Sequence, residues 1–129
     1  MKTLSINLSI IKNGLTKQFS SVFIHQSNLT LSFLNVLFRE GVIRSYSILP
    51  NNKIEVFLKY YKGVSVIENI TSISTSSRSM YYSIEDICYW KNNYSPFNSF
   101  LVLNTSKNIF SSNELNKYKV GGQVLCIIN

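Results

Sequence analysis

The chain has 129 residues and a formal net charge of +7, with thirteen Lys and Arg against six Asp and Glu. This length suits one domain or two small lobes, and it allows a core that needs no disulfide or metal. The positive balance favours an anionic partner, either nucleic acid or an acidic membrane surface. The apolar runs are far too short to span a bilayer, so no membrane is expected among the partners.

The beginning of the chain predicts neither a secretory signal peptide nor an Arg-rich transit peptide, because Leu4 to Leu8 is interrupted by polar residues. The sequence contains no alanine, whereas Asn, Ile, Ser, Lys, Phe and Tyr are abundant. AT-rich codons encode most of these residues, so we infer an AT-rich genome. A protein made inside an organelle and one made in an AT-rich cytoplasm both fit these observations.

The first half predicts the order helix, strand, helix, strand, strand. Apolar residues recur at helical spacing up to Ile11, and Asn13-Gly14 is predicted to cap that helix. A strand is predicted over Phe19 to Ile24, and Asn28 is the expected N-cap of a second helix that ends at Gly41. The two remaining strands, joined by a turn at Pro50-Asn51-Asn52, are Val42 to Leu49 and Lys53 to Tyr60.

Lys62-Gly63 is the predicted boundary between an N-terminal α/β lobe, 1–62, and a C-terminal β-rich lobe, 63–129, with short helices. The fold class is therefore α/β, of the α+β kind. The predicted strands of the second lobe are Val64 to Ile70, Met80 to Tyr82, Phe100 to Leu103 and Val124 to Ile128. Two capping boxes are expected to start its helices, Ser83-x-x-Asp86 and Ser111-x-x-Glu114. Asn92 to Asn98 is a predicted loop.

Signals for catalysis or a metal are poor. His25 is the only histidine, and no carboxylate stands at metal-ligand spacing from it. Glu85 and Asp86 are adjacent on a helix, so they point apart and are expected to stabilise its N-terminus. Cys88 and Cys126 lie in apolar settings and are predicted to be buried thiols. We therefore expect no catalytic residue, metal, cofactor or small-molecule substrate.

Binding signals are better and gather in the last third of the chain. Asn104, Thr105, Ser106, Lys107 and Asn108 follow a buried strand, and Gly121, Gly122 and Gln123 open the last strand. Phosphate and sugar oxygens accept hydrogen bonds from hydroxyls, amides and exposed backbone N–H groups, and the flanking Lys117 and Lys119 add positive charge. We therefore predict that RNA binds there. Two ordinary strand ends with polar turns remain an equal alternative.

Two further segments leave alternatives open. The serine-rich stretch Ser72 to Ser79, which contains Arg78, is either a flexible linker or a loop that faces RNA. The tyrosines sit in strand patterns and are predicted to pack in the core rather than to stack on bases.

The order of these pieces resembles the bacterial and organellar small-subunit ribosomal protein eight family over nearly the whole chain. The matching residues are Lys12-Asn13-Gly14, Leu34-Asn35-Val36-Leu37, Glu40-Gly41-Val42-Ile43, Leu58-Lys59-Tyr60, Lys62-Gly63, Val66 to Ile70, Thr105-Ser106-Lys107, Gly121-Gly122 and Leu125-Cys126. Each piece alone is weak, but together and in order they are specific.

The resemblance implies two α/β lobes, no catalysis, and a structural role in the small ribosomal subunit. It implies binding to a stem in the central domain of the small-subunit ribosomal RNA, an early role in assembling that domain, and neighbouring small-subunit proteins as partners. In the family the second lobe makes most RNA contacts, and the first adds contacts from the loop that here includes Ser27 and Asn28. Lys12 is a further candidate contact.

The chain departs from the family pattern at several of these positions. Asn104 and Asn108 replace a serine and a glycine, Gln123 replaces a glutamate, and Asn28 stands where a lysine is usual. Asparagine tolerates positive φ, so we expect the turn at Asn108 to survive. Such drift suits an organelle-encoded mitochondrial protein, with a plastid or an AT-rich bacterial cytoplasm as alternatives. The rival function is a basic RNA-binding regulatory or protein-interaction module outside the ribosome.

Overall fold

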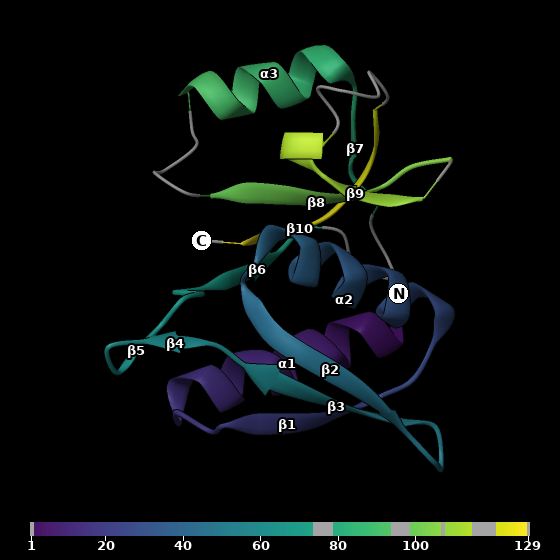
Figure 1. Cartoon of the computed structure of the whole chain (residues 1–129). Coiled ribbons are helices and arrows are strands. Elements are labelled where there is room, and N and C mark those ends of the chain that lie inside the picture. Colours follow the sequence, from purple (N-terminus) through teal and green to yellow (C-terminus); the bar gives the residue numbers. More distant parts are fainter. Residues whose placement is uncertain (1, 74–78, 94–98, 107, 115–120, 129) are drawn as a thin grey trace. The chain divides into compact units, whose positions relative to one another are not determined.

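The computed structural model describes residues 2–73, 79–93, 99–106, 108–114 and 121–128. The chain forms two compact units, Met1–Glu68 and Asn69–Asn129, and each combines helices with antiparallel strands (Figure 1). The predicted α+β class is confirmed. The sequence predicted a boundary at Lys62-Gly63, whereas residues 63–68 belong to the first unit, because a short hairpin folds them back onto it.

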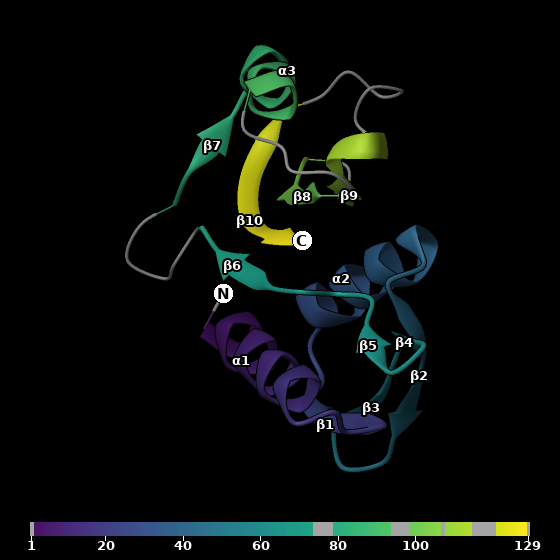
Figure 2. The ribbon, with the colours of Figure 1, turned by 90° about the vertical axis from the view of Figure 1, so that its left-hand side faces the viewer.

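The first unit is a three-stranded antiparallel sheet in the order β1-β3-β2 with two helices on one side, as Figures 1 and 2 show. Its elements are α1 (Lys2–Thr16), β1 (Ser21–His25), α2 (Asn28–Glu40), β2 (Ile43–Leu49), β3 (Lys53–Leu58), β4 (Tyr60–Tyr61) and β5 (Val64–Ser65). The helix-strand-helix-strand-strand order is as predicted. Ile54, Val56 and Leu58 alternate with exposed or half-buried residues along β3, so one sheet face forms the core.

The first helix is longer than its sequence predicted. Gly14 does not cap α1 but lies inside it, and the helix continues to Thr16. A Cβ atom on Gly14 would lie 2.4 Å from Cγ1 of Val22 on β1. The glycine therefore serves close packing between helix and strand, and the predicted C-cap is wrong.

The second helix starts one residue earlier than expected from its capping signal. Ser27, not Asn28, is the N-cap: its Oγ accepts a hydrogen bond from the backbone N–H of Thr30. Both residue types cap well, and the backbone of Ser27 has the extended conformation that a cap requires. Gly41 ends the helix as predicted, with φ of 76°.

The second unit is built around the strand β10 (Gly122–Ile128), which pairs with strands on both sides. The order is β6-β10-β8-β9, and β7 also pairs with β10. The other elements are β6 (Ile70–Ser72), β7 (Tyr81–Tyr82), α3 (Ile84–Asn93), β8 (Phe100–Asn104) and β9 (Ile109–Ser111). Ile87 and Trp90 of α3 pack on Leu101, Leu103 and Val124 of the sheet.

Several local predictions for this part of the chain can be compared with the structure. The capping box of α3 is confirmed, since Ser83 N–H donates to Asp86 Oδ2 and Asp86 N–H donates to Ser83 Oγ. The second box also starts helical residues, 112–114, and residues 115–120 lie outside the described part of the chain. The single predicted strand Val64 to Ile70 is wrong: β5 ends at Ser65, and the next strand begins at Ile70.

The loop predicted from Asn92 begins later, because α3 continues to Asn93, and residues 94–98 lie outside the described part of the chain. Cys126 is buried as predicted, but Cys88 is exposed. Ile87 and Trp90 occupy the buried side of α3, so the helical repeat turns Cys88 outward.

Candidate nucleic-acid interface

The connection between β8 and β9 contains hydrogen bonds between Thr105 and Asn108. Thr105 Oγ1 donates to the carbonyl oxygen of Asn108 at 2.6 Å and accepts from the Asn108 N–H at 3.2 Å, while the Thr105 N–H also donates to the Asn108 carbonyl. The side-chain oxygen of Asn108 accepts from the Ile109 N–H at 2.8 Å. Thr105 is half-buried, whereas Ser106 and Asn108 are exposed. The exposed polar side chains of Ser106 and Asn108 therefore lie beside a network of hydrogen bonds between Thr105 and Asn108.

Asn108 stands where the family has a glycine, and its side chain satisfies the next backbone N–H, that of Ile109.

The glycine pair lies between two backbones. A Cβ atom on Gly121 would lie 2.5 Å from the Tyr82 carbonyl oxygen, and one on Gly122 would lie 2.5 Å from the Asn104 carbonyl oxygen. The φ of Gly122 is not positive. Close packing inside the second unit therefore explains both glycines.

Gln123 joins the polar turn to β7. It pairs with Asn104 on one side and with Tyr81 on the other, and its Nε2 donates to Ser79 Oγ at 3.1 Å. The structure thus brings together six predicted site residues at one end of the sheet, namely Asn104, Thr105, Asn108, Gly121, Gly122 and Gln123. Ser106 lies in the turn itself.

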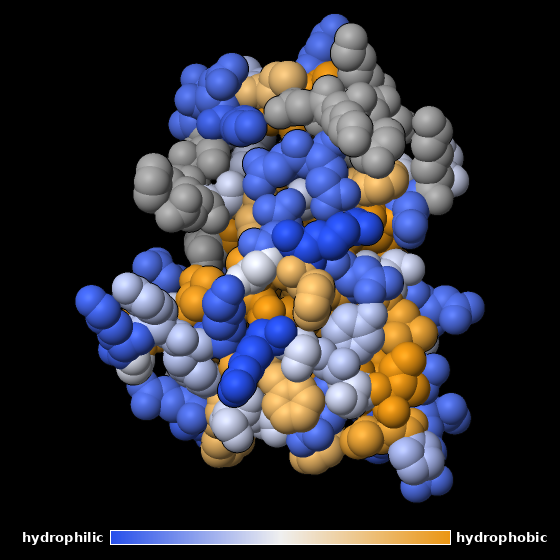
Figure 3. Space-filling model, viewed as in Figure 1, coloured by the Kyte–Doolittle hydropathy of each residue, from blue (hydrophilic) through white to orange (hydrophobic). Residues whose placement is uncertain are grey.

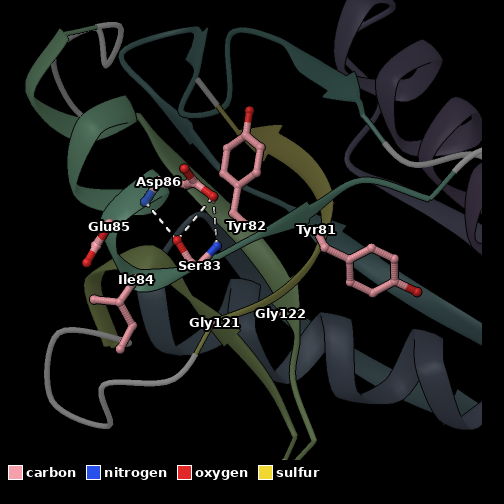
Figure 4. A pocket seen from close by; sticks show the side chains of 8 residues that line it. All are labelled: Tyr81, Tyr82, Ser83, Ile84, Glu85, Asp86, Gly121 and Gly122. Atoms are coloured by element: carbon pink, nitrogen blue, oxygen red, sulfur yellow. Dashed lines mark hydrogen bonds between the residues drawn. The ribbon is translucent and has the colours of Figure 1, made fainter.

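An open pocket adjoins this end of the sheet (Figure 4). It is lined by Tyr81, Tyr82, Ser83, Ile84, Glu85, Asp86, Gly121 and Gly122. Asp86 turns back toward Ser83, whose N–H and hydroxyl both donate to Oδ2, while Glu85 points away from that pair. The two carboxylates do not face each other, so the structure gives them no shared general acid–base site. Their negative charge would repel phosphate, which limits the phosphate-binding surface on this side.

The first unit holds the remaining described candidates. Ser27 Oγ donates to Thr30 Oγ1 at 2.8 Å, so this hydroxyl serves the helix cap. Asn28 and Lys12 are exposed, and Lys12 lies within the length of α1 rather than after its end. Asn7, only 1% exposed, holds the loop before α2: its amide donates to the His25 carbonyl and Thr30 Oγ1 and accepts from the His25 N–H.

The other predicted contacts, Lys107, Lys119, Lys117 and Arg78, lie outside the described residues. The prediction that the tyrosines pack in the core is confirmed for Tyr82, which is half-buried and packs against the core of the second unit, and is wrong for Tyr61, Tyr81 and Tyr89, which are exposed. Tyr46 and Tyr60 are half-buried. β4 and β7 have two residues each, which is too short for the alternation that identifies a buried side. Tyr81, which is 71% exposed and beside Gln123, is a further candidate for the interface that sequence reasoning missed.

Other kinds of site find little support in the described part of the chain. No group of three His, Cys, Asp or Glu side chains there is placed to hold a metal ion. His25 is exposed, and burial raises the pKa of the Cys126 thiol, which keeps it protonated and a poor nucleophile. Within the described residues, no helix has the length and apolar character needed to cross a membrane.

Comparison with known proteins identifies the family. The family model described as Ribosomal protein S8 matches residues 2–129. The chain belongs to the ribosomal protein S8 family. The resemblance seen in the sequence is thereby confirmed.

The relatives in this family include a protein named uS8m and several bacterial proteins named uS8. The chain is 34% identical to small ribosomal subunit protein uS8m of Acanthamoeba castellanii, over 100% of both chains. It is 34% identical to small ribosomal subunit protein uS8 of Rhizobium rhizogenes and 37% identical to that of Rhizobium meliloti, each over 94% of this chain and 92% of the relative. Membership in this family supports a structural rather than an enzymatic role.

Proposed function

We propose that this protein is a structural constituent of a small ribosomal subunit, where it binds a stem in the central domain of the ribosomal RNA and helps to assemble that domain. The observation that carries the proposal is the juxtaposition of the Thr105–Asn108 turn with the Gly121–Gln123 segment in a chain that matches the S8 family from end to end. Neighbouring small-subunit proteins are its other expected partners.

The chemistry of the turn supports duplex RNA as the ligand. Bases of an A-form stem are inaccessible in its deep groove, so proteins contact 2′-hydroxyls and phosphates across the shallow groove. Exposed Ser106 and Asn108 offer short donors and acceptors next to the hydrogen bond between Thr105 and Asn108. Lys107 and Lys119 add positive charge nearby in sequence.

A mitochondrial ribosome is the proposed location. The full-length similarity to the Acanthamoeba protein uS8m and the alanine-free composition support it. The rhizobial relatives are similarly close, so a plastid or an AT-rich bacterial cytoplasm are the competing locations. Fractionation of the source cells, followed by sedimentation of the organelle's ribosomes after a high-salt wash, tests both the location and the ribosomal role.

The RNA ligand is tested by titrating the full chain with a transcript of the central-domain stem and with an unrelated duplex of equal length. We expect tighter binding to the stem, and a log–log slope with salt of about −0.7 to −0.9 per phosphate neutralised. Lys107→Ala should reduce that slope by about one. Equal affinity for both duplexes would contradict recognition of the stem, and recovery of diverse messenger RNAs from total RNA would favour the regulatory alternative.

A further inference from the structure

The β4–β5 hairpin of the first unit has an inner and an outer face. Tyr60 pairs with Ser65 and Tyr61 pairs with Val64, so each pair projects to its own side of the hairpin. The inner pair is held in place: the Tyr60 hydroxyl donates to the Phe19 carbonyl at 2.6 Å, and Ser65 Oγ donates to the Ile67 carbonyl at 2.9 Å. The outer pair is turned toward solvent.

The outer face exposes apolar and aromatic surface that the fold does not use. Tyr61 is 69% exposed and Val64 is 65% exposed. The ammonium group of Lys62 lies 5.4 Å from the centre of the Tyr61 ring, within the range of a cation–π contact. Figure 3 shows mainly hydrophilic and near-neutral residues over this hairpin, at the left edge of the view. An aromatic ring and a positive charge are thus displayed side by side on an element whose inner face is anchored.

Further positive charge lies on and around the hairpin. Lys59 immediately precedes β4, is exposed, and donates to the Gly41 carbonyl at the end of α2. Within residues 1–68 the acids are only Glu40, Glu55 and Glu68, against Lys2, Lys12, Lys17, Arg39, Arg44, Lys53, Lys59 and Lys62. The first unit therefore carries a strong formal excess of positive charge, although the proposed stem-binding turn belongs to the second.

We propose that the outer face of the β4–β5 hairpin binds an unpaired segment of RNA, with a base stacked on Tyr61 and a phosphate at Lys62. This inference rests on the proposal that the chain binds RNA, but it concerns a separate surface in the other unit. A ring adds binding energy only where a base can leave its stack, whereas a duplex would use the lysines alone. The positive charge favours a polyanion over a neutral protein surface.

The test uses the full chain and two probes, a single-stranded oligouridylate and a blunt RNA duplex of the same length. Tyr61→Leu removes the ring but keeps apolar surface, and Tyr61→Phe keeps the ring. We expect Tyr61→Leu to weaken single-strand binding about five- to a hundredfold and Tyr61→Phe to leave it near that of the unmodified protein. Duplex binding should be the same for all three proteins. Tyr89→Leu, at an exposed tyrosine on α3, is the matched control.

The outcomes separate this inference from the proposed function. Loss of stem binding in a turn variant such as Ser106→Ala, with single-strand binding intact, would leave the hairpin site standing. Unchanged single-strand binding in Tyr61→Leu would overturn the inference, and so would equal losses in Tyr61→Leu and Tyr61→Phe. If Tyr61→Leu binds both probes normally but no longer sediments with small subunits, the hairpin contacts a protein instead, which also overturns it.

Discussion

Gly122 in β10 faces the backbone of Asn104 in β8 so closely that a Cβ atom would lie 2.5 Å from its carbonyl oxygen. The obstacle is main chain in a paired strand, so it cannot rotate away as a flexible side chain would. The clash is therefore present in the free protein.

Gly122→Ala should therefore lower the stability of the protein without RNA. Overpacking of this kind costs about 1–3 kcal/mol. Thermal unfolding monitored by circular dichroism measures the effect. Thr71→Val, at an exposed position of β6 in the same sheet, is the control and should change little. A Gly122→Ala protein with the melting temperature of the unmodified chain would show that β8 and β10 can separate at no cost.

Thr105→Ala should affect both the turn and RNA binding. The hydroxyl makes two hydrogen bonds to the Asn108 backbone, so its loss should cost about 1 kcal/mol of local stability. Faster hydrogen exchange at the Asn108 amide would report this opening. Thr105→Ser keeps the hydroxyl, and failure of this variant to restore protection of the amide would refute the account of the turn.

Ser106→Ala removes an exposed hydroxyl and should weaken binding to the RNA stem without a change in stability. We expect a loss of about 1–3 kcal/mol in binding free energy, the cost of a hydrogen bond to a phosphate.

Asn7→Ala should destabilise the first unit. The buried amide joins α1 to β1 and α2, and its removal leaves the His25 backbone groups without a side-chain partner. We expect a loss of about 1–3 kcal/mol in the free energy of unfolding, measured by urea denaturation. Ser9→Ala, on the exposed side of the same helix, should have little effect. Equal midpoints for the two variants would argue against a structural role for the buried amide.

The two cysteines should differ sharply in reactivity. Burial raises the pKa of the Cys126 thiol, so no thiolate forms at neutral pH, whereas Cys88 is exposed. Iodoacetamide should alkylate Cys88 in the native protein and Cys126 only after unfolding, as read by mass spectrometry of the peptides. Above the pKa of an unfolded thiol, ionisation of Cys126 favours the unfolded state, so its contribution to stability is lost as pH rises. Native labelling of Cys126 at the rate of Cys88 would contradict its burial.

The predictions that succeeded rest on signals confined to one element. The glycine cap at Gly41, the capping box at Ser83 and Asp86, and the alternation along β3 are each decided within a few residues. The errors arose where a distant segment decides. Gly14 resembles a helix end until Val22 is packed against it, and the glycine pair resembles a flexible turn until β7 and β8 lie beside it.

The residues of the candidate site could be predicted from the sequence, but their contacts could not. Its polar residues could be named from the sequence because they follow strand ends, and the structure gathers six of them. Their hydrogen bonds could not be predicted, since Thr105 and Asn108 face each other only once the turn has formed. The exposure of Tyr61 and Tyr81 was also missed, because strands of two residues show no periodicity.

The position of the glycine pair constrains how this protein can change. The atoms nearest to a Cβ on Gly121 or Gly122 are carbonyl and Cα atoms of Tyr82, Ser83 and Asn104, which every amino acid possesses; Cγ2 of Thr105, 3.1 Å from the Cβ of Gly122, is a side-chain atom that also lies close. No replacement at the first three of these positions can make room for a side chain on β10. Second-site suppressors of a glycine variant should therefore not arise at Tyr82, Ser83 or Asn104, because relief of those contacts requires movement of a whole strand.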